Sequence, residues 1–336
     1  MGLRRRLIFA AALAAAPLAV GISVAAADLV AGEWSPFEGG PETTCADGSQ
    51  PMFLERQADP SKVVLYLEGG GGCWSTETCT FDGPGKAYVS SSDIVPDLLT
   101  DRGGIFDAEH PENPVAGFSF VYVPYCTGVV HLGTATYEYA PDLVVEHKGF
   151  YNSMAGLEHL VANYPDAEEV LVTGPSAGSV PTPLLGALVA DRLPSARVVT
   201  LGDSSGAYPD DALLNVFVGL VWGTEGAIPD WPETADIGLS EWSMPGLYVF
   251  AGQHAPDVTY ARFDYAYDAA QAERTSFIGI DADDLVTLID QNEATVEASG
   301  TELVSYVAPG TGHTLIDDDT MYALEVEGVR FRDWFS

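Results

Sequence analysis

Positive charge is scarce in this sequence. Only 14 lysine and arginine residues oppose 49 aspartates and glutamates, which gives a formal net charge of -35. Lysine itself occurs only at Lys62, Lys86 and Lys148. Such a surface repels nucleic acid and anionic membranes, so neither is an expected partner. It suits instead a solvated acidic coat in salty surroundings, where ions screen the repulsion.

Cysteine is also rare, with four residues in the chain. No Cys-x-x-Cys pair occurs and no histidine stands beside a cysteine at ligand spacing, so no zinc or other metal site is expected. An even count in an exported chain indicates two disulfides, for which four cysteines allow three pairings. Cys73 and Cys79 are close enough in sequence to staple one loop, which would leave Cys45 with Cys126.

Long hydrophobic runs are missing beyond the N-terminus, so no stretch there is expected to span a bilayer. Residues 1–27 differ: three arginines precede an apolar stretch that Pro17 interrupts and that closes on Ala25, Ala26 and Ala27. This pattern predicts a secretory signal peptide cut near Ala27, with an uncleaved membrane anchor as the alternative. We therefore expect a secreted or otherwise exported protein.

What the sequence does contain is an alternation of strand and helix patterns. Apolar β-branched and aromatic runs predict strands, and apolar residues at helical spacing predict helices. The predicted strands are 63–67, 118–124, 168–174, 196–203, 258–265 and 302–310, and the predicted helices are 150–164 and 181–192. This order predicts an α/β fold with a mainly parallel sheet covered by helices on both faces. Residues 28–336 are expected to form one domain, in which 207–242 are an insertion that caps the site.

Two Gly-x-Ser-x-Gly sequences compete for the role of nucleophile, 174–178 around Ser176 and 202–206 around Ser204. A nucleophile elbow needs a strand that ends at the serine, small flanking residues and a helix just after it. Residues 174–178 meet all three conditions, whereas a helix after 202–206 begins late, beyond Pro209. Ser176 is therefore the preferred nucleophile.

A serine nucleophile needs a base and a carboxylate that orients the base. His313 follows the last predicted strand in a glycine-rich loop, where an α/β-hydrolase presents its histidine. Asp268 follows the preceding strand, and the order Ser176, Asp268, His313 is the usual order for that fold. Asp257 and Asp203 are the alternative acids.

An oxyanion hole needs two backbone N–H donors aimed at the developing negative charge. Ala177, directly after the serine, supplies one of them. The glycine run after the first predicted strand supplies the other, from Gly70 or Gly71. Glycines there let the main chain approach a substrate without obstruction from side chains.

The ordered set of motifs resembles the pectin acetylesterase family, which includes the Notum carboxylesterases. The segments "YLEGGGGCW" with Cys79 following, "VPYCTGVVH", "GPSAGS" and "YDAAQ" carry the resemblance, in family order. It implies an α/β-hydrolase fold and ester hydrolysis without a cofactor. It also implies the catalytic residues Ser176, Asp268 and His313, the oxyanion donors Gly70, Gly71 and Ala177, and the disulfides Cys73–Cys79 and Cys45–Cys126.

The sequence departs from that family at positions expected in the pocket walls. Gly72 stands where the family has Trp or Tyr, Pro175 replaces a cysteine, and Val129 replaces a common acidic residue. We expect a monomeric serine carboxylesterase that hydrolyses acetyl esters on carbohydrates, and not anionic pectin itself. A long-chain lipid or lipopeptide deacylase and a catalytically silent binding protein are the alternatives.

Overall fold

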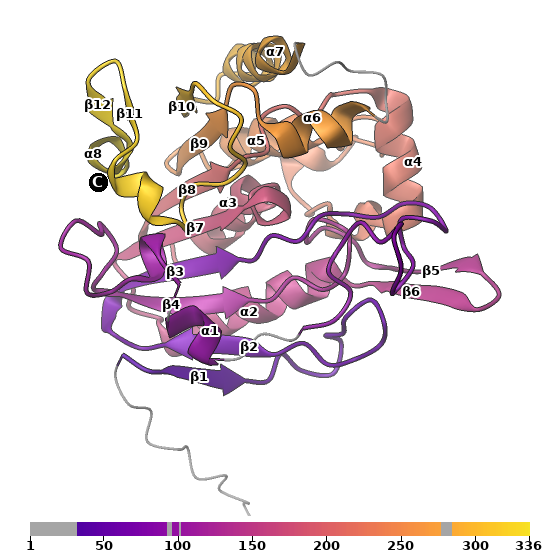
Figure 1. Ribbon diagram of the computed structural model, residues 1–336, viewed down its shortest axis with the longest axis horizontal. Helices are drawn as coiled ribbons and strands as arrows, with labels where there is room; N and C mark the ends of the chain where they lie inside the picture. The colour runs from indigo at the N-terminus through magenta and orange to yellow at the C-terminus, as the bar shows by residue number, and fades with distance from the viewer. Residues whose placement is uncertain (1–31, 93–95, 101, 277–283) are drawn as a thin grey trace, which may run out of the picture.

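The computed structural model describes residues 32–336 apart from 93–95, 101 and 277–283, so the predicted signal peptide lies outside the described residues. Eight strands form one sheet in the order β1-β2-β4-β3-β7-β8-β9-β10 (Figure 1). Their bounds are β1 Trp34–Phe37, β2 Phe53–Arg56, β3 Asp59–Leu67, β4 Phe118–Val123, β7 Glu169–Pro175, β8 Arg197–Asp203, β9 Thr259–Tyr265 and β10 Leu303–Ala308. The six strands predicted from the sequence are the six that run parallel.

The inner parallel strands are apolar runs because their central residues are buried on both faces of the sheet, whereas β10 at the edge is partly exposed. β4, for example, is buried along its whole length. β1 and β2 pair antiparallel at one edge, and β2 also runs antiparallel to β4. The sequence did not reveal these two strands because each has only four residues and lies in a polar, turn-rich stretch.

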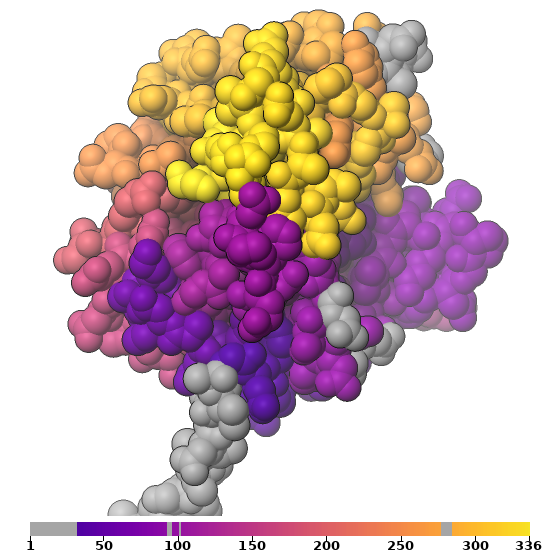
Figure 2. All heavy atoms as spheres, turned by 60° about the vertical axis from the view of Figure 1, so that its left-hand side comes forward, coloured from indigo at the N-terminus to yellow at the C-terminus, as the bar shows by residue number. Residues whose placement is uncertain are grey.

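Helices cover one face of the sheet: α2 Gly149–Asn163, α3 Thr182–Arg192 and α5 Met244–His254. The first two match the predicted helices closely. The other face is covered mainly by short elements, namely α1 Pro96–Thr100, the 3-10 helices Gly104–Phe106 and Asp319–Tyr322, and α8 Phe331–Phe335. These elements come from two distant parts of the chain. Figure 2 shows the C-terminal residues, in yellow, against the purple residues near position 100. The Tyr322 hydroxyl donates to the Gly104 carbonyl at 2.8 Å.

The remaining elements lie around the sheet. They are the hairpin β5 Ala135–Ala140 and β6 Leu143–His147, α4 Ala212–Trp222, the 3-10 helices Thr224–Ala227 and Pro232–Thr234, α6 Ala269–Ser276, α7 Leu285–Ala298, and the short pair β11 Glu325–Val326 and β12 Val329–Arg330. α4 and the hairpin lie on the side toward which β3 and β4 point (Figure 1). Among the described residues, no helix has the length and hydrophobicity to cross a membrane.

Candidate active site

Ser176 lies on a sharp turn between β7 and the 3-10 helix Ser176–Gly178. Its φ of 54° is rare for a residue with a side chain. The turn packs so tightly on the end of β3 that a Cβ at Gly174 or Gly178 would lie 2.1 or 1.9 Å from the Leu67 carbonyl oxygen. Both flanking residues must therefore be glycine, and the serine is presented at the C-terminal edge of the sheet.

His313 and Asp268 converge on this serine from distant parts of the chain. His313 Nε2 lies 2.8 Å from Ser176 Oγ, and His313 Nδ1 lies 2.7 Å from Asp268 Oδ2. Asp268 comes between β9 and α6, and His313 follows β10. The three side chains thus form a continuous hydrogen-bonded row from carboxylate to imidazole to hydroxyl.

Asp268 is held in place by a buried network. Its Oδ1 accepts the N–H groups of Ala270 and Gln271 at 2.8 and 2.9 Å. The Gln271 side-chain amide donates to Asp268 Oδ2 at 3.0 Å and to Asp264 Oδ1 at 3.1 Å. Gln271 ends the segment "YDAAQ" but had no predicted role, because sequence spacing does not show that its side-chain amide lies between Asp264 and Asp268.

The electrostatics favour a protonated histidine more than free solution does. Burial alone would lower the pKa of His313, but its hydrogen bond with Asp268 and the charge of that carboxylate outweigh burial and raise the pKa above 6.5. The side chain is about one-third exposed, since its relative accessibility is 32%. His313 can therefore receive a proton from Ser176 while it stays in contact with the cavity beside it.

The three alternative residues lie elsewhere. Asp203 ends β8 and Ser204 follows it, and their side chains bond to the loop that carries His313 instead of to its ring. Asp257 lies two residues before β9 and lines a separate, smaller cavity with Glu302. The stretch "LYVFAG", which would have made Asp257 the acid had it been a strand, belongs to helix α5.

The predicted oxyanion donors Gly70, Gly71 and Ala177 line the same cavity as Ser176. Among the described residues, no protein acceptor is found for the backbone N–H of these three residues, whereas the Gly72 N–H donates to the Ala87 carbonyl. Gly71 has a φ of 80°, which only glycine adopts easily. The loop therefore leaves N–H groups free beside the serine.

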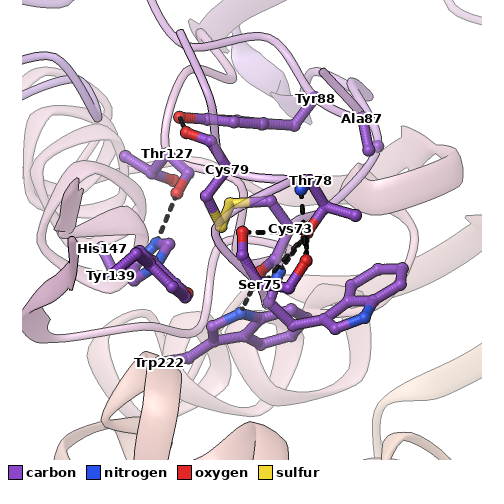
Figure 3. The surroundings of a disulfide bond; sticks show 12 residues. Cys73, Ser75, Thr78, Cys79, Ala87, Tyr88, Thr127, Tyr139, His147 and Trp222 are labelled. Carbon is purple, nitrogen blue, oxygen red and sulfur yellow. Dashed lines mark hydrogen bonds between the residues drawn. A yellow bond between two sulfur atoms is a disulfide. The ribbon is translucent and has the colours of Figure 1, made fainter. Parts of the chain in front are cut away.

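Two disulfides brace this region, Cys45–Cys126 and Cys73–Cys79, the pairs that the resemblance implies. The Trp222 indole N–H donates to the Cys73 carbonyl at 2.7 Å, which ties α4 to the glycine loop (Figure 3). The fold also brings a ring nitrogen of His147 to within 4.8 Å of both sulfur atoms, although His147 is far from the two cysteines in the sequence. Because both sulfurs are in the disulfide, this group has no thiolate to offer a metal.

A cavity of about 750 Å³ opens beside Ser176 and His313. One side is apolar and is formed largely by α4 and its neighbours, with Trp74, Leu214, Phe217, Val218, Trp222 and Met244. The lining also includes four charged side chains, those of Glu68, Arg102, Arg274 and Asp317. The Arg102 guanidinium is paired with Asp317, and burial raises the pKa of Glu68.

The strand order and the elbow after β7 define an α/β-hydrolase. A solved structure described as the Wnt deacylase Notum from Drosophila superposes with a TM-score of 0.63 at 16% identity, covering 90% of this chain and 91% of that one. The family described as Pectinacetylesterase matches residues 38–215. The chain belongs to this family, as the sequence motifs predicted.

Curated relatives carry two different activities in their names. Palmitoleoyl-protein carboxylesterase notum1 of Xenopus laevis is 29% identical over 175 residues, which cover 48% of this chain and 34% of that protein. Pectin acetylesterase 4 of Arabidopsis thaliana is 27% identical over 177 residues, which cover 51% of this chain and 41% of that protein. The matched segment thus spans about a third to two fifths of these relatives.

Proposed function

We propose that this chain is a serine carboxylesterase whose catalytic residues are Ser176, His313 and Asp268. The observation that carries the proposal is the row of two hydrogen bonds, at 2.8 and 2.7 Å, that joins hydroxyl, imidazole and carboxylate. In the reaction His313 takes the Ser176 proton as Oγ attacks the ester carbonyl, and then passes it to the leaving alcohol. Water, deprotonated by His313, releases the acid from the acyl-enzyme.

The negative charge that develops on the carbonyl oxygen is stabilised by backbone N–H groups. Ala177 and either Gly70 or Gly71 are the proposed donors, since their N–H groups have no protein acceptor among the described residues. Fixed donors need no reorganisation as the charge appears, and losing one costs about 3–4 kcal/mol of transition-state stabilisation in comparable enzymes. No step of this mechanism calls for a metal or a cofactor.

For the acyl group, the cavity favours a chain longer than acetate. An acetyl group would fill only a small part of a cavity of about 750 Å³, and the wall formed by Phe217, Val218 and Trp222 offers apolar contact. We therefore propose an ester of a medium or long acyl chain, the alternative named in the sequence analysis.

The second candidate is the acetyl ester of a carbohydrate expected from the sequence. The charged residues of the lining support a hydroxyl-rich leaving group, because Glu68, Arg102 and Asp317 offer hydrogen-bond donors and acceptors to an alcohol. The two candidates agree on a polar alcohol and differ in the acyl chain.

We further propose that the chain acts as an exported monomer of one domain. A single eight-stranded sheet and two disulfides support this view, since disulfides persist in oxidising compartments. Residues 207–242 supply α4 to the cavity wall and are the proposed cap.

The test compares acetyl, octanoyl and palmitoyl esters of one chromogenic alcohol. We expect the octanoyl ester to be cleaved with a higher kcat/KM than the acetyl ester, and Ser176→Ala to lose activity by ~10⁴-fold or more. Because neutral His313 is the base, kcat/KM should rise with pH through a pKa above 6.5.

A fluorophosphonate probe should label the parent chain and not Ser176→Ala. Full activity in that variant would overturn the nucleophile, and an absence of labelling would favour a silent binding protein.

A further inference from the structure

The turn 202–206 contains Ser204, the alternative nucleophile, whose hydroxyl does not reach the His313 ring; this turn instead holds the loop that carries His313. Asp203 Oδ2 accepts the N–H groups of Leu315 and Ile316 at 2.8 and 2.9 Å. The Ser204 hydroxyl contacts the His313 carbonyl oxygen. Two neighbouring side chains at the end of β8 therefore fix the backbone of residues 313–316.

Counting the protons in this group defines its chemistry. Ser204 Oγ lies 3.0 Å from Asp203 Oδ1 and also contacts the His313 carbonyl oxygen. The hydroxyl has one proton, and a carbonyl or an ionised carboxylate oxygen can only accept. An ionised Asp203 would therefore leave one of the two oxygen–oxygen contacts without a hydrogen. A proton on Asp203 Oδ1 satisfies both, since Asp203 then donates to Ser204 and Ser204 donates to His313.

The surroundings of Asp203 also disfavour its charge. Its exposed fraction is 0%, and no ion pair to it is found among the described residues. Burial raises its pKa to about 7, against the two backbone donors, which lower it. The titratable groups whose fields act on it or feel it are His313, Asp317, Tyr66 and Tyr265, with Arg102 paired to Asp317.

We propose that Asp203 works as a neutral carboxylic acid which, through Ser204 and through two backbone N–H groups, locks the histidine loop and so positions His313 at Ser176. Asp203 touches no reacting atom and is a positioning residue. The catalytic consequence rests on the proposed function, whereas the bonding does not. The experiment therefore has one arm that needs no activity.

The first arm measures thermal unfolding between pH 4 and 8 in the Ser176→Ala background, with and without Asp203→Asn. The asparagine reproduces the neutral acid: its oxygen accepts both N–H groups and its amide donates to Ser204. Because the pKa of Asp203 is raised in the folded state, its contribution to stability is full below the ordinary value of 3.8 and is lost as pH rises through about 7.

The melting temperature of the asparagine protein should therefore equal its parent's at pH 4 and exceed it by several degrees at pH 7. A protein that fails to fold, or that melts lower than its parent at every pH, would mean that the ionised carboxylate is the native form, and the proposal would be wrong.

The second arm measures ester hydrolysis in the active chain. Asp203→Asn should keep kcat within about threefold, whereas Ser204→Gly should lower kcat by roughly 10 to 100-fold with little change in KM, because the ester still binds while the base is misplaced. Glycine is chosen because Ser204 has a φ of 73°. Ser205→Ala is the matched control, since no hydrogen bond from that hydroxyl to residues 313–316 is found in the described part of the chain. Equal kcat values for Ser204→Gly and the control would exclude the positioning role.

Discussion

At the scale of single residues, Gly72 lies in the cavity wall next to Trp222. It lines the cavity, and a Cβ built there would meet the Gly128 carbonyl at 3.5 Å and the Trp222 ring at 3.8 Å, which are ordinary contacts. The family that the motifs resemble has Trp or Tyr at this position. The missing aromatic ring leaves open the apolar side of the cavity, where the proposed acyl chain lies.

Filling that space should shorten the accepted acyl chain. We expect Gly72→Phe to lower kcat/KM for octanoyl esters about tenfold or more relative to acetyl esters, because each methylene excluded from an apolar pocket is costly. Rates on a series of acyl lengths give the measurement. Gly117→Phe is the control, since that glycine is exposed and a Cβ there meets nothing within 4 Å. An unchanged acyl preference in Gly72→Phe would place the acyl chain elsewhere.

Some residues of the candidate site could be predicted from the sequence and others could not. Ser176, Asp268 and His313 each follow a predicted strand, so their convergence at one edge of a parallel sheet could be expected from the sequence. The role of Ser204 could not, because its partner His313 lies 109 residues further along the chain. That of Gln271 could not either, because sequence spacing does not show that its amide lies between the carboxylates of Asp264 and Asp268.

At the scale of elements, the two disulfides serve different ends. Cys45–Cys126 spans 81 residues and Cys73–Cys79 only six. Chain-entropy reasoning assigns the longer loop about 4 to 5 kcal/mol of stabilisation and the shorter one about 2 to 3 kcal/mol. The shorter one, however, directly follows the glycines beside Ser176, and its first cysteine receives the Trp222 indole bond.

Removing the two disulfides one at a time should affect the free energy of unfolding and kcat to different extents. We expect Cys45→Ala with Cys126→Ala to lower the free energy of unfolding more than Cys73→Ala with Cys79→Ala, as measured by denaturant titration. The second pair should lower kcat more, because its loss frees the glycine loop from its brace. If kcat survives intact in that variant, the brace is not what orders the oxyanion donors.

The strand-rich parts of the fold were easier to predict than the cap. Buried parallel strands can be predicted from apolar runs in the sequence, as in 118–124. α4 could not be predicted in this way, because Leu213 and Leu220 make its outer face apolar too, with exposures of 82% and 66%. A helix without a polar face has no clear helical period in the sequence.

At the scale of the whole molecule, the net charge of -35 is spread over a chain with few cations to offset it. Ion pairs such as Lys62–Glu169, Arg192–Glu158 and Arg197–Glu169 lie at the surface, where each contributes little. Repulsion among the carboxylates therefore opposes the compact state at low ionic strength.

Salt should stabilise this protein. Raising NaCl from 0.1 to 1 M shortens the screening length from about 10 to about 3 Å, so we expect the melting temperature to rise by ~5 °C or more. Thermal scans over a salt series provide the measurement, and sucrose serves as a control for solvent exclusion without screening. A melting temperature that falls with salt would mean that attractive pairs outweigh the repulsion.

The packing of Gly174 and Gly178 on the Leu67 carbonyl makes Ser176, the proposed nucleophile, and the glycine loop parts of one rigid block, since they follow the ends of the adjacent strands β7 and β3. His313 belongs to a separate segment, the loop after β10. Mild denaturation that loosens this loop would therefore move the imidazole away from Ser176 and abolish the proposed activity while Ser176 stays in place. Recovery would require only that this one loop docks again.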